Sequence, residues 1–405
     1  MKNSGVEWIG EIPDDWEVKP VKRYFSHVKR IVGDDVDKYE RLSLTMQGVL
    51  KRSKDDAEGL QPEKFNGYQI LKQNELVFKL IDLENVNTSR VGISPFNGLV
   101  SPAYIILTNN KKDNTFYYYW FLNMYYQEIF NKLGDGGVRS ALNASDVLSL
   151  PMVYLNNETQ QCIASYLDKK CSKIEETIQN QQQVIEKLKA YKQSLITEAV
   201  TGKVKIENGK ICGEYESYKD SGVEWIGKIP SGWEVKKAKY FIKISNGSDP
   251  KTEEGDTPVY GSGAESFKTC VEFKEGPTVL IGRKGATLHI PHYIEGNYWN
   301  VDTAFDVKTY SEEILLLKFY YYCATAFDYR FYLTSTTLPS MTQTNYGNMY
   351  LPVPNTLVQK KIVEFLDNKY NAIDTAIEQK QKLIEKLTEY KKSLIYECVT
   401  GKKEI

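Results

Sequence analysis

The most constraining feature of this chain is a repeat of very long period. Lys2–Lys19 reads KNSGVEWIGEIPDDWEVK, and it returns almost unchanged as KDSGVEWIGKIPSGWEVK at Lys219–Lys236. A second pair, Ile185–Lys203 and Ile384–Lys402, shares IEKL, SLI and VTGK. Between these anchors the two halves diverge almost completely. A period of about 200 residues is too long for a solenoid and indicates two whole domains, with a common frame and different variable parts.

Composition limits the class of protein. The chain has 405 residues, 41% hydrophobic and 26% charged, which is typical of a soluble protein with room for two cores. Its net charge of −1 argues against a broadly basic nucleic-acid binder, so any such surface must be local or shared with a more basic partner. No apolar run approaches about 18 residues and the start lacks a signal-peptide form, so we expect a cytoplasmic location. The cysteines form no CxxC pair and are expected to be reduced: Cys162, Cys171, Cys212, Cys270, Cys323 and Cys398.

Each half ends in a long heptad pattern. The spacing predicts helices that begin shortly after Pro151 and Pro354 and end at Gly202 and Gly401, each about 60 Å long at 1.5 Å per residue. Because a single apolar seam of this length needs a partner helix, we expect either pairing between the two helices or dimerisation with a second copy. The expected interhelix packing residues are Leu167, Ile174, Ile178, Ile185, Leu188 and Leu195, with Leu366, Ile373, Ile377, Ile384, Leu387 and Leu394.

Connectivity favours an antiparallel pair within one chain. The first helix leads into the second variable domain, and the second helix starts where that domain ends. If the helices pair about their centres, Gln181 meets Lys380 and Leu167 meets Leu394. The end of the second helix then returns to the amino-terminal SGVEWIG segment, which gives a nearly circular layout with approximate twofold symmetry.

The repeated residues resemble a known family. SGVEWIGEIPDDWEV, the Tyr-Leu-Asp and Phe-Leu-Asp triplets at Tyr166–Asp168 and Phe365–Asp367, and LITEAVTGK are similar to the specificity (S) subunit of Type I restriction-modification systems. The resemblance covers both halves in order. It implies two target-recognition domains, each reading one half of a split, asymmetric site in double-stranded DNA.

The same resemblance implies partners. The helices would set the separation of the two half-sites and dock DNA adenine methyltransferase subunits, expected to be two in number. Through these they would dock ATP-dependent restriction subunits that translocate DNA. S-adenosylmethionine, ATP and Mg are then expected on these partner subunits, with no cofactor and no metal on this chain and no membrane association. The family's S subunit is not known to catalyse a reaction.

Motifs for catalysis are weak or missing in the sequence. No Asn/Asp-Pro-Pro-aromatic run, FxGxG-type loop or GxxxxGK[ST] loop occurs, so we expect neither methyl-donor nor ATP binding. PDDWEVK imitates a PD-(D/E)xK nuclease site, but Ser231 replaces the first Asp in the second copy. We instead expect Trp8, Trp16, Trp225 and Trp233 to pack as aromatic anchors against the helices. His289 and His292 form an HxxH pair without a third nearby ligand.

Residues that read different DNA sequences should differ between the two copies. The aromatic runs Phe116–Phe121 and Phe319–Cys323 occur in both halves, which favours core packing over base stacking. The divergent, polar and Gly-rich stretches are the better candidates, because Arg, Lys, Gln, Ser and Thr reach base edges and phosphates. The candidate DNA-binding residues are Gln47, Lys51, Arg52, Arg90, Arg139 and Ser140 in the first half, and Ser262, Lys268, Arg283, Lys284, Thr287, Thr336, Thr337, Ser340 and Gln343 in the second.

The sequence therefore predicts an α+β protein with two mixed α/β target-recognition domains joined by two long helices paired as an antiparallel coiled coil. The expected boundaries are residues 1–150 and 219–350 for the recognition domains, 151–205 and 351–405 for the helical spacers, and 206–218 for a linker. The predicted function is DNA sequence recognition for a restriction-modification complex. The alternative from another class is a coiled-coil adaptor that binds only proteins.

Overall fold

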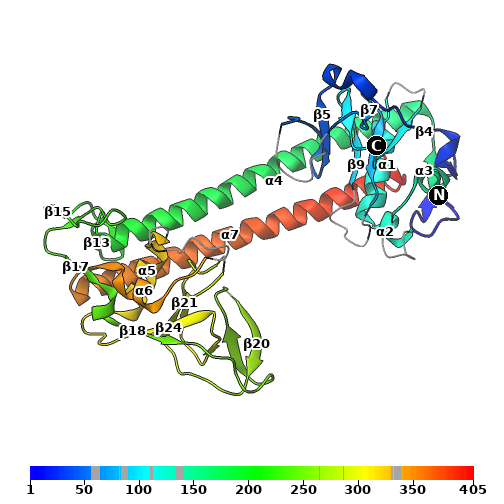
Figure 1. The fold of residues 1–405 in the computed structure, drawn as a ribbon. Helices are drawn as coiled ribbons and strands as arrows, with labels where there is room; N and C mark the ends of the chain where they lie inside the picture. Colours follow the sequence, from blue (N-terminus) through cyan, green and yellow to red (C-terminus); the bar gives the residue numbers. More distant parts are fainter. Residues whose placement is uncertain are drawn as a thin grey trace. The chain divides into compact units, whose positions relative to one another are not determined.

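The computed structural model describes residues 1–55, 64–81, 83, 90–109, 113–133, 141–263, 265–285, 287–329, 332 and 339–405. The chain combines helices with small mixed sheets, which confirms the predicted α+β class (Figure 1). It divides into two compact units. Unit 1 comprises Met1–Asn180 with Lys382–Ile405, and unit 2 comprises Gln181–Gln381. Each unit includes part of each long helix, α4 (Asn157–Val200) and α7 (Thr356–Val399).

Two four-stranded sheets form the body of unit 1. Their strand orders are β6-β5-β10-β7 and β4-β11-β8-β9, and all neighbours are antiparallel except the parallel pair β5 and β10. The strands are β4 (Ser26–Val28), β5 (Arg41–Thr45), β6 (Gly48–Arg52), β7 (Gln69–Leu71), β8 (Leu76–Lys79), β9 (Arg90–Ile93), β10 (Gly98–Val100) and β11 (Ile105–Thr108). The 3-10 turns η1 (Val21–Arg23) and η2 (Gly33–Lys38) flank β4.

The sheet β4-β11-β8-β9 of unit 1 is buried on both faces. Along β8, Leu76 and Phe78 face the main core, whereas Val77 faces a smaller core shared with Leu42 and Leu44 of the other sheet. Successive side chains in a strand point to opposite faces, so one continuous apolar run serves two cores.

The aromatic helix α1 (Thr115–Tyr126) packs in the main core, which confirms core packing for this run. Phe116, Tyr117, Trp120 and Phe121 are almost fully buried. A helix that is apolar on all sides must be covered on all sides. The hydroxyl of Tyr119 donates to Asp168 of α4 at 2.8 Å, which links α1 to the long helix. The short helices α2 (Ile129–Leu133) and α3 (Ala144–Ser149) follow.

Unit 2 repeats this plan. One sheet has the order β18-β24-β21-β22 and a second the order β20-β19-β23. The aromatic helix α5 (Leu317–Ala326) corresponds to α1, and its Tyr322 hydroxyl donates to Asp367 of α7 at 2.5 Å. The remaining elements are η3 (Ala238–Tyr240), β18 (Ile242–Asn246), β19 (Thr257–Tyr260), β20 (Ser266–Cys270), β21 (Thr278–Gly282), β22 (His292–Ile294), β23 (Trp299–Asn300), β24 (Ala304–Thr309) and α6 (Gln343–Asn348).

The repeated sequence segments form a repeated frame of two-stranded antiparallel sheets. β3 (Glu17–Pro20) pairs with β12 (Pro151–Tyr154), and β17 (Glu234–Lys237) pairs with β25 (Tyr350–Val353). These pairs place the WEVK end of each repeated segment beside the strand that precedes a long helix. The other pairs are β1 (Lys2–Asn3) with β2 (Glu11–Ile12), β15 (Tyr218–Asp220) with β16 (Lys228–Pro230), and β13 (Ile206–Glu207) with β14 (Lys210–Ile211).

Both long helices end at the predicted glycines. Gly202 and Gly401 each have φ +71°, and the next residue's N–H closes a hydrogen bond to the last helical turn, from Lys203 to Glu198 and from Lys402 to Glu397. This left-handed residue after a helix is the usual place for glycine. Trp16 and Trp233 lie against these glycines, as expected. Trp8 and Trp225 pack instead on Trp120 of α1 and on Phe327 after α5.

Within each unit the two long helices run in opposite directions. In unit 1, Lys391 of α7 pairs with Glu175 of α4. In unit 2, Lys192 pairs with Asp374 at 2.5 Å, and Lys380 donates to Gln181 at 3.1 Å, as the centred antiparallel pairing predicts. Of the heptad residues, Leu167, Ile174, Ile185, Leu195, Leu366, Ile373, Ile384 and Leu394 are buried, and Ile178, Leu188, Ile377 and Leu387 are partly buried against the unit cores.

The end of α7 lies beside the amino-terminal segment in unit 1. The Lys402 ammonium donates to the Ile9 carbonyl at 2.8 Å, and Gly401 approaches the Pro13 ring. Figure 1 accordingly marks both chain ends in this unit. Within the described residues, none of the helices is long and apolar enough to cross a membrane.

Candidate nucleic-acid interface

The candidate DNA-binding stretches occupy the same three connections in both units. The first is the β5–β6 hairpin with Gln47, matched by the β19–β20 hairpin with Ser262. The second is the β8–β9 connection up to Arg90, matched by the β21–β22 connection with Arg283. The third precedes the short helix α3 or α6. The candidate stretches of the two halves thus occupy topologically equivalent connections, although their sequences differ.

In unit 2 the structure brings these three connections together at one end of a sheet. Lys284 forms an isolated antiparallel bridge with Ser340, and the Met341 amide donates to the Arg283 carbonyl at 2.9 Å. A Cβ built on Gly285 would lie 3.1 Å from the Ser262 hydroxyl oxygen. Arg283, Lys284, Ser262 and Ser340 therefore form one cluster, although up to about 80 residues separate them in sequence.

The guanidinium of Arg283 is oriented by two contacts. Its Nη1 donates to the Asp302 carbonyl at 3.3 Å, and its Cζ lies 5.9 Å from the centroid of the buried Phe305 ring. A carbonyl and an aromatic face hold the side chain without neutralising its charge, since neither carries a negative charge. An oriented, charged fork of this kind is suited to bidentate contact with guanine or phosphate.

Three further candidates of unit 2 lie within the described residues. Gln343, the first residue of α6, donates through Nε2 to the Asn246 side-chain oxygen at 3.0 Å. Thr287 is half-buried in the loop that follows Arg283. Lys268 lies on β20, with its ammonium 5.9 Å from the Phe267 ring centroid. Thr336 and Thr337 lie outside the described residues.

Sequence reasoning missed Asn246 as a member of this cluster. It ends β18 within the stretch SNGSD, and the register pairs it with Phe305 of β24, next to the Arg283 loop. The stretch is as polar and Gly-containing as those selected from the sequence, so the same criterion could have found it.

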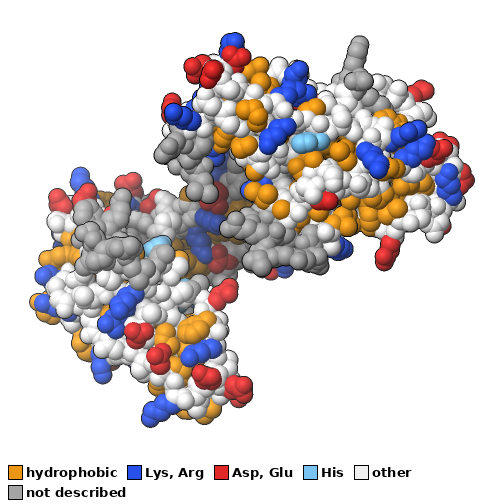
Figure 2. Space-filling view, turned by 45° about the vertical axis from the view of Figure 1, so that its right-hand side comes forward, with side chains coloured by type: hydrophobic (Ala, Val, Ile, Leu, Met, Phe, Trp, Pro, Cys, Tyr) orange, Lys and Arg blue, Asp and Glu red, His pale blue; other side chains and the backbone are white. Residues whose placement is uncertain are grey.

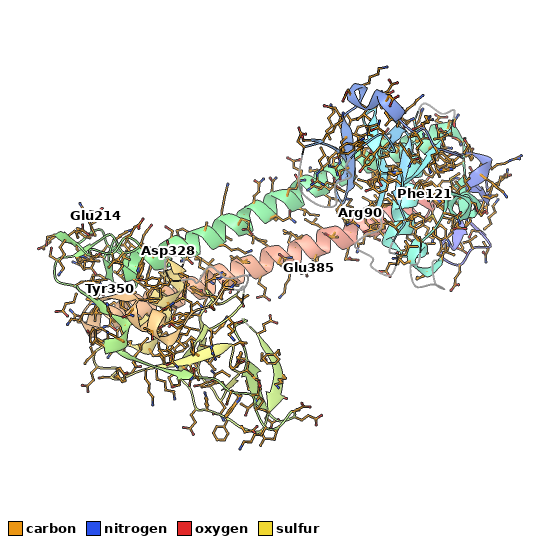
Figure 3. The ribbon with its side chains drawn as sticks, viewed as in Figure 1. Arg90, Phe121, Glu214, Asp328, Tyr350 and Glu385 are labelled. Atoms are coloured by element: carbon orange, nitrogen blue, oxygen red, sulfur yellow. The ribbon has the colours of Figure 1, made fainter. Side chains whose placement is uncertain are left out.

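Among the candidates of unit 1, Lys51 is restrained by an acidic neighbour. Gln47 is exposed in the β5–β6 turn. Lys51 pairs with Glu40 at 2.6 Å and lies 5.0 Å from the Phe96 ring centroid. Arg52 and Arg90 are half-buried at the end of β6 and the start of β9. Figure 3 labels Arg90 at the margin of the unit and Phe121 among densely packed side chains. Arg139 and Ser140 lie outside the described residues.

A groove of about 930 Å³ adjoins the β5–β6 hairpin. Its walls combine amide groups from the hairpin and the β7–β8 turn with the aromatic rings of Phe96 and Tyr118. The exposed Met46 lies nearby and its sulfur accepts from the Tyr125 hydroxyl at 3.7 Å. The groove is lined by Gln47, Gly48, Val49, Leu50, Gln73, Asn74, Ile93, Ser94, Pro95, Phe96 and Tyr118.

Charge is mixed on both units. Figure 2 shows Lys and Arg side chains interspersed with Asp and Glu on the visible face. Besides Lys51 with Glu40, Lys54 lies 4.0 Å from Asp37, and Lys274 lies 3.5 Å from Asp306. Because these cations already have acidic partners, their contribution to counterion release from DNA is reduced.

The features that imitate catalytic or metal sites have local structural roles. Asp14 accepts from the amino terminus at 3.1 Å, and Glu17 pairs with its neighbour Lys19. His289 is exposed, whereas His292 is half-buried and burial lowers its pKa. Within the ranges that the structure describes, no group of three His, Cys, Asp or Glu side chains could hold a metal ion.

Comparison with protein families and solved structures supports the recognition made from the repeats. Residues 230–386 match the family described as Type I restriction modification DNA specificity domain. This segment runs from the last residue of β16 through the three candidate connections of unit 2 and into α7. The recognition of the Type I specificity family is therefore confirmed.

Solved structures resemble this chain to different degrees. One is described as "Structural basis underlying complex assembly and conformational transition of the type I R-M system"; it has a TM-score of 0.70, 12% identity, and coverage of 97% of this chain and 100% of that chain. A Type I S subunit from M. genitalium has a TM-score of 0.45 at 16% identity, covering 98% of this chain and 99% of its own. The HsdS subunit from Thermoanaerobacter tengcongensis has a TM-score of 0.48 at 11% identity, covering 100% of both chains. Only the first structure, with a TM-score above 0.5, supports a shared fold.

Proposed function

We propose that this chain, whose residues 230–386 match the family described as Type I restriction modification DNA specificity domain, reads a split, asymmetric site in double-stranded DNA, one half-site with each unit. Unit 2 would use the cluster around Arg283 and unit 1 the β5–β6 hairpin with Arg90. In this reading the scaffold is shared and the recognition loops are specific to each half-site.

The observation that carries the proposal is the contrast between frame and loops. The Tyr119–Asp168 and Tyr322–Asp367 hydrogen bonds repeat, and so do the two frame sheets. The three connections that surround Arg283 do not repeat in sequence. A protein that bound one partner twice would be expected to repeat its contact residues, whereas two different half-sites require different side chains.

We further propose that α4 and α7 form one antiparallel coiled coil along their length and that this coiled coil fixes the gap between the half-sites. The unbroken heptads and the antiparallel contacts within each unit support this. The domain boundaries then follow the sequence pattern, with recognition domains at residues 1–150 and 219–350, spacers at 151–205 and 351–405, and a linker at 206–218.

The chain would act as a non-catalytic subunit. Adenine methyltransferase subunits and ATP-dependent restriction subunits would supply the chemistry, together with S-adenosylmethionine, ATP and Mg. The mixed charge of both units supports a basic partner, because an isolated chain with paired cations gains little from phosphate contacts.

An exchange of one recognition domain tests the proposal. The chain is expressed with its methyltransferase, and residues 20–150 are replaced by the equivalent segment of a relative that has a different target. A map of modified bases should show one half-site changed and the other half-site and the gap retained. The reciprocal exchange of residues 237–350 serves as control and should change only the other half-site. A change in both half-sites, or in neither, would reject the assignment of one unit to each half.

A further inference from the structure

Two side-chain amides meet at the edge of the Arg283 cluster. Gln343 Nε2 donates to Asn246 Oδ1 at 3.0 Å, across 97 residues of sequence. Asn246 is exposed at the end of β18, and Gln343 is half-buried at the start of α6. Both positions belong to regular elements, so the pair does not depend on the conformation of a long loop.

The neighbourhood places this pair beside the other candidate readers. Asn246 pairs in register with Phe305, the ring below the Arg283 guanidinium. Gln343 follows Ser340 and Met341, which contact Lys284 and Arg283 through the backbone. The Thr342 hydroxyl accepts from the Asn345 amide at 3.0 Å and fixes the first turn of α6. The amide pair and the arginine are thus presented from one end of the same sheet.

A glutamine amide complements the major-groove edge of adenine. Adenine offers an N–H donor at N6 and an acceptor at N7, and a glutamine amide can accept from the first and donate to the second. The bond to Asn246 uses one N–H of Gln343 and restricts rotation of its amide. The Oε1 acceptor and the second N–H can then meet adenine with less loss of side-chain entropy.

The pair exists in unit 2 alone among the equivalent positions. In unit 1, Arg30 follows Phe25 at the same spacing as Asn246 follows Phe241, and Ala144 begins α3 as Gln343 begins α6. Arg30 has a structural role there, since it forms two hydrogen bonds of 2.8 Å with Glu75. A residue pair that recognises only one half-site is expected in one unit and absent from the equivalent positions of the other.

We propose that Gln343, positioned by Asn246, reads one adenine in the half-site of unit 2. This inference rests on the proposed function and adds an element of the target to it. In this proposal Asn246 makes no direct base contact and acts as a positioning residue for Gln343.

The test is a map of modified bases from cells that express the chain with its methyltransferase. The variants are Gln343→Ala, Asn246→Ala and Gln343→Glu. Asn297→Ala is the matched control, because Asn297 is an exposed amide beyond the opposite end of β22. Thermal unfolding of each purified variant is compared with that of the original chain, and Gln343→Glu provides a second, nearly isosteric variant if Gln343→Ala loses stability.

We expect Gln343→Ala to relax a single adenine position in one half-site, with discrimination there reduced about 5- to 150-fold, the loss of one bidentate contact. Asn246→Ala should relax the same position to a smaller extent. Gln343→Glu should shift preference there from adenine toward cytosine, whose N4 amino group donates to a carboxylate. Asn297→Ala should leave the motif unchanged.

Some outcomes would overturn the inference while leaving the proposed function intact. These are an unchanged split motif in all three variants, relaxation at different positions for Gln343 and Asn246, or relaxation at a base other than adenine. If the original chain instead yields no split motif, the proposed function fails as well, and this result is distinguishable because it appears before any substitution is made.

Discussion

At the scale of single residues, Arg283 gives the clearest energetic prediction. Its guanidinium is held by the Asp302 carbonyl and the Phe305 ring, so binding DNA would not first require it to leave an acidic partner. Arg283→Ala should weaken binding of the methyltransferase complex to its cognate DNA by about 1 to 3 kcal/mol, the usual value of a bidentate base contact. The measurement is a binding titration with cognate DNA and with DNA substituted at one base of the half-site.

The neighbouring Lys284 serves as the control for Arg283. If it contacts only phosphate, Lys284→Ala should weaken binding to both DNAs equally and reduce the salt slope by about one. Arg283 would be excluded as a base reader if Arg283→Ala weakened binding to the cognate and substituted DNAs to the same extent.

The burial of His292 predicts that the chain loses thermal stability in mild acid. Burial lowers the pKa of this imidazole, so the folded chain favours its neutral form. As pH falls, His292 of the unfolded chain is protonated first, near pH 6.5, because its pKa in the folded chain is lower. The free energy of unfolding therefore decreases from about pH 6.5 downward, until the pH has passed the folded-state pKa of His292. His292→Gln should reduce the fall in thermal midpoint between about pH 7 and pH 5. Equal falls in the original chain and in His292→Gln would contradict this role of burial.

The candidate DNA-binding residues could be predicted from sequence only in part. Ser262, Arg283, Lys284 and Ser340 could be selected because divergent Gly-rich stretches between apolar runs indicate loops. Their assembly into one cluster could not be predicted, since it depends on the register of β21 with β24 and on the bridge from Lys284 to Ser340. The acidic partner of Lys51 was equally hidden, because Glu40 immediately precedes β5 and reaches Lys51 only through the pairing of β5 with β6.

At the scale of secondary-structure elements, the end of α4 depends on a glycine for two reasons. Gly202 has φ +71°, and a Cβ there would also meet the Pro230 ring within 2.5 to 2.7 Å. Gly222 has a similar φ of +70° but nothing within 4 Å. Gly222→Ala should therefore cost about 1 kcal/mol of stability through backbone strain alone. Gly202→Ala should cost about 1 to 3 kcal/mol more through overpacking.

Chemical denaturation of the two variants, followed by tryptophan fluorescence, measures this difference. Trp233, one of the six tryptophans of the chain, lies against Gly202 and contributes to this signal. Equal destabilisation by the two substitutions would mean that the contact between the helix end and the SGVEWIG frame contributes little.

The long helices were the most predictable elements and the sheets the least. The heptads predicted a helix over about residues 158–199, and α4 spans Asn157–Val200. The strands of the sheets are only two to six residues long, and those such as β8 are apolar on both faces, so they lack the alternation that marks a half-buried strand. The order in which these strands pair depends on contacts between residues distant in sequence. One sequence alone does not specify these contacts.

At the scale of the whole molecule, the proposed coiled coil should act as a ruler for DNA. Insertion of four helix-forming residues after Gln181 and four after Lys380 lengthens both helices by about 6 Å and turns them by about 400°, so the seam is nearly restored. The gap in the target should grow by about one or two base pairs at 3.4 Å each, with both half-sites unchanged. Paired insertions of two residues rotate the seam by about 200° and should abolish assembly.

The base-modification map of the paired insertions checks this prediction. An unchanged gap with a functional complex would show that these helices do not set the spacing. Altered bases within a half-site would show that they affect recognition itself.

The most direct test of the whole account is the modification map of the original chain expressed with its methyltransferase. Two units built on one frame but with different loops predict a single motif with two unlike half-sites separated by an unspecified gap. A short contiguous palindrome would contradict the account, because it would require the two units to read the same bases.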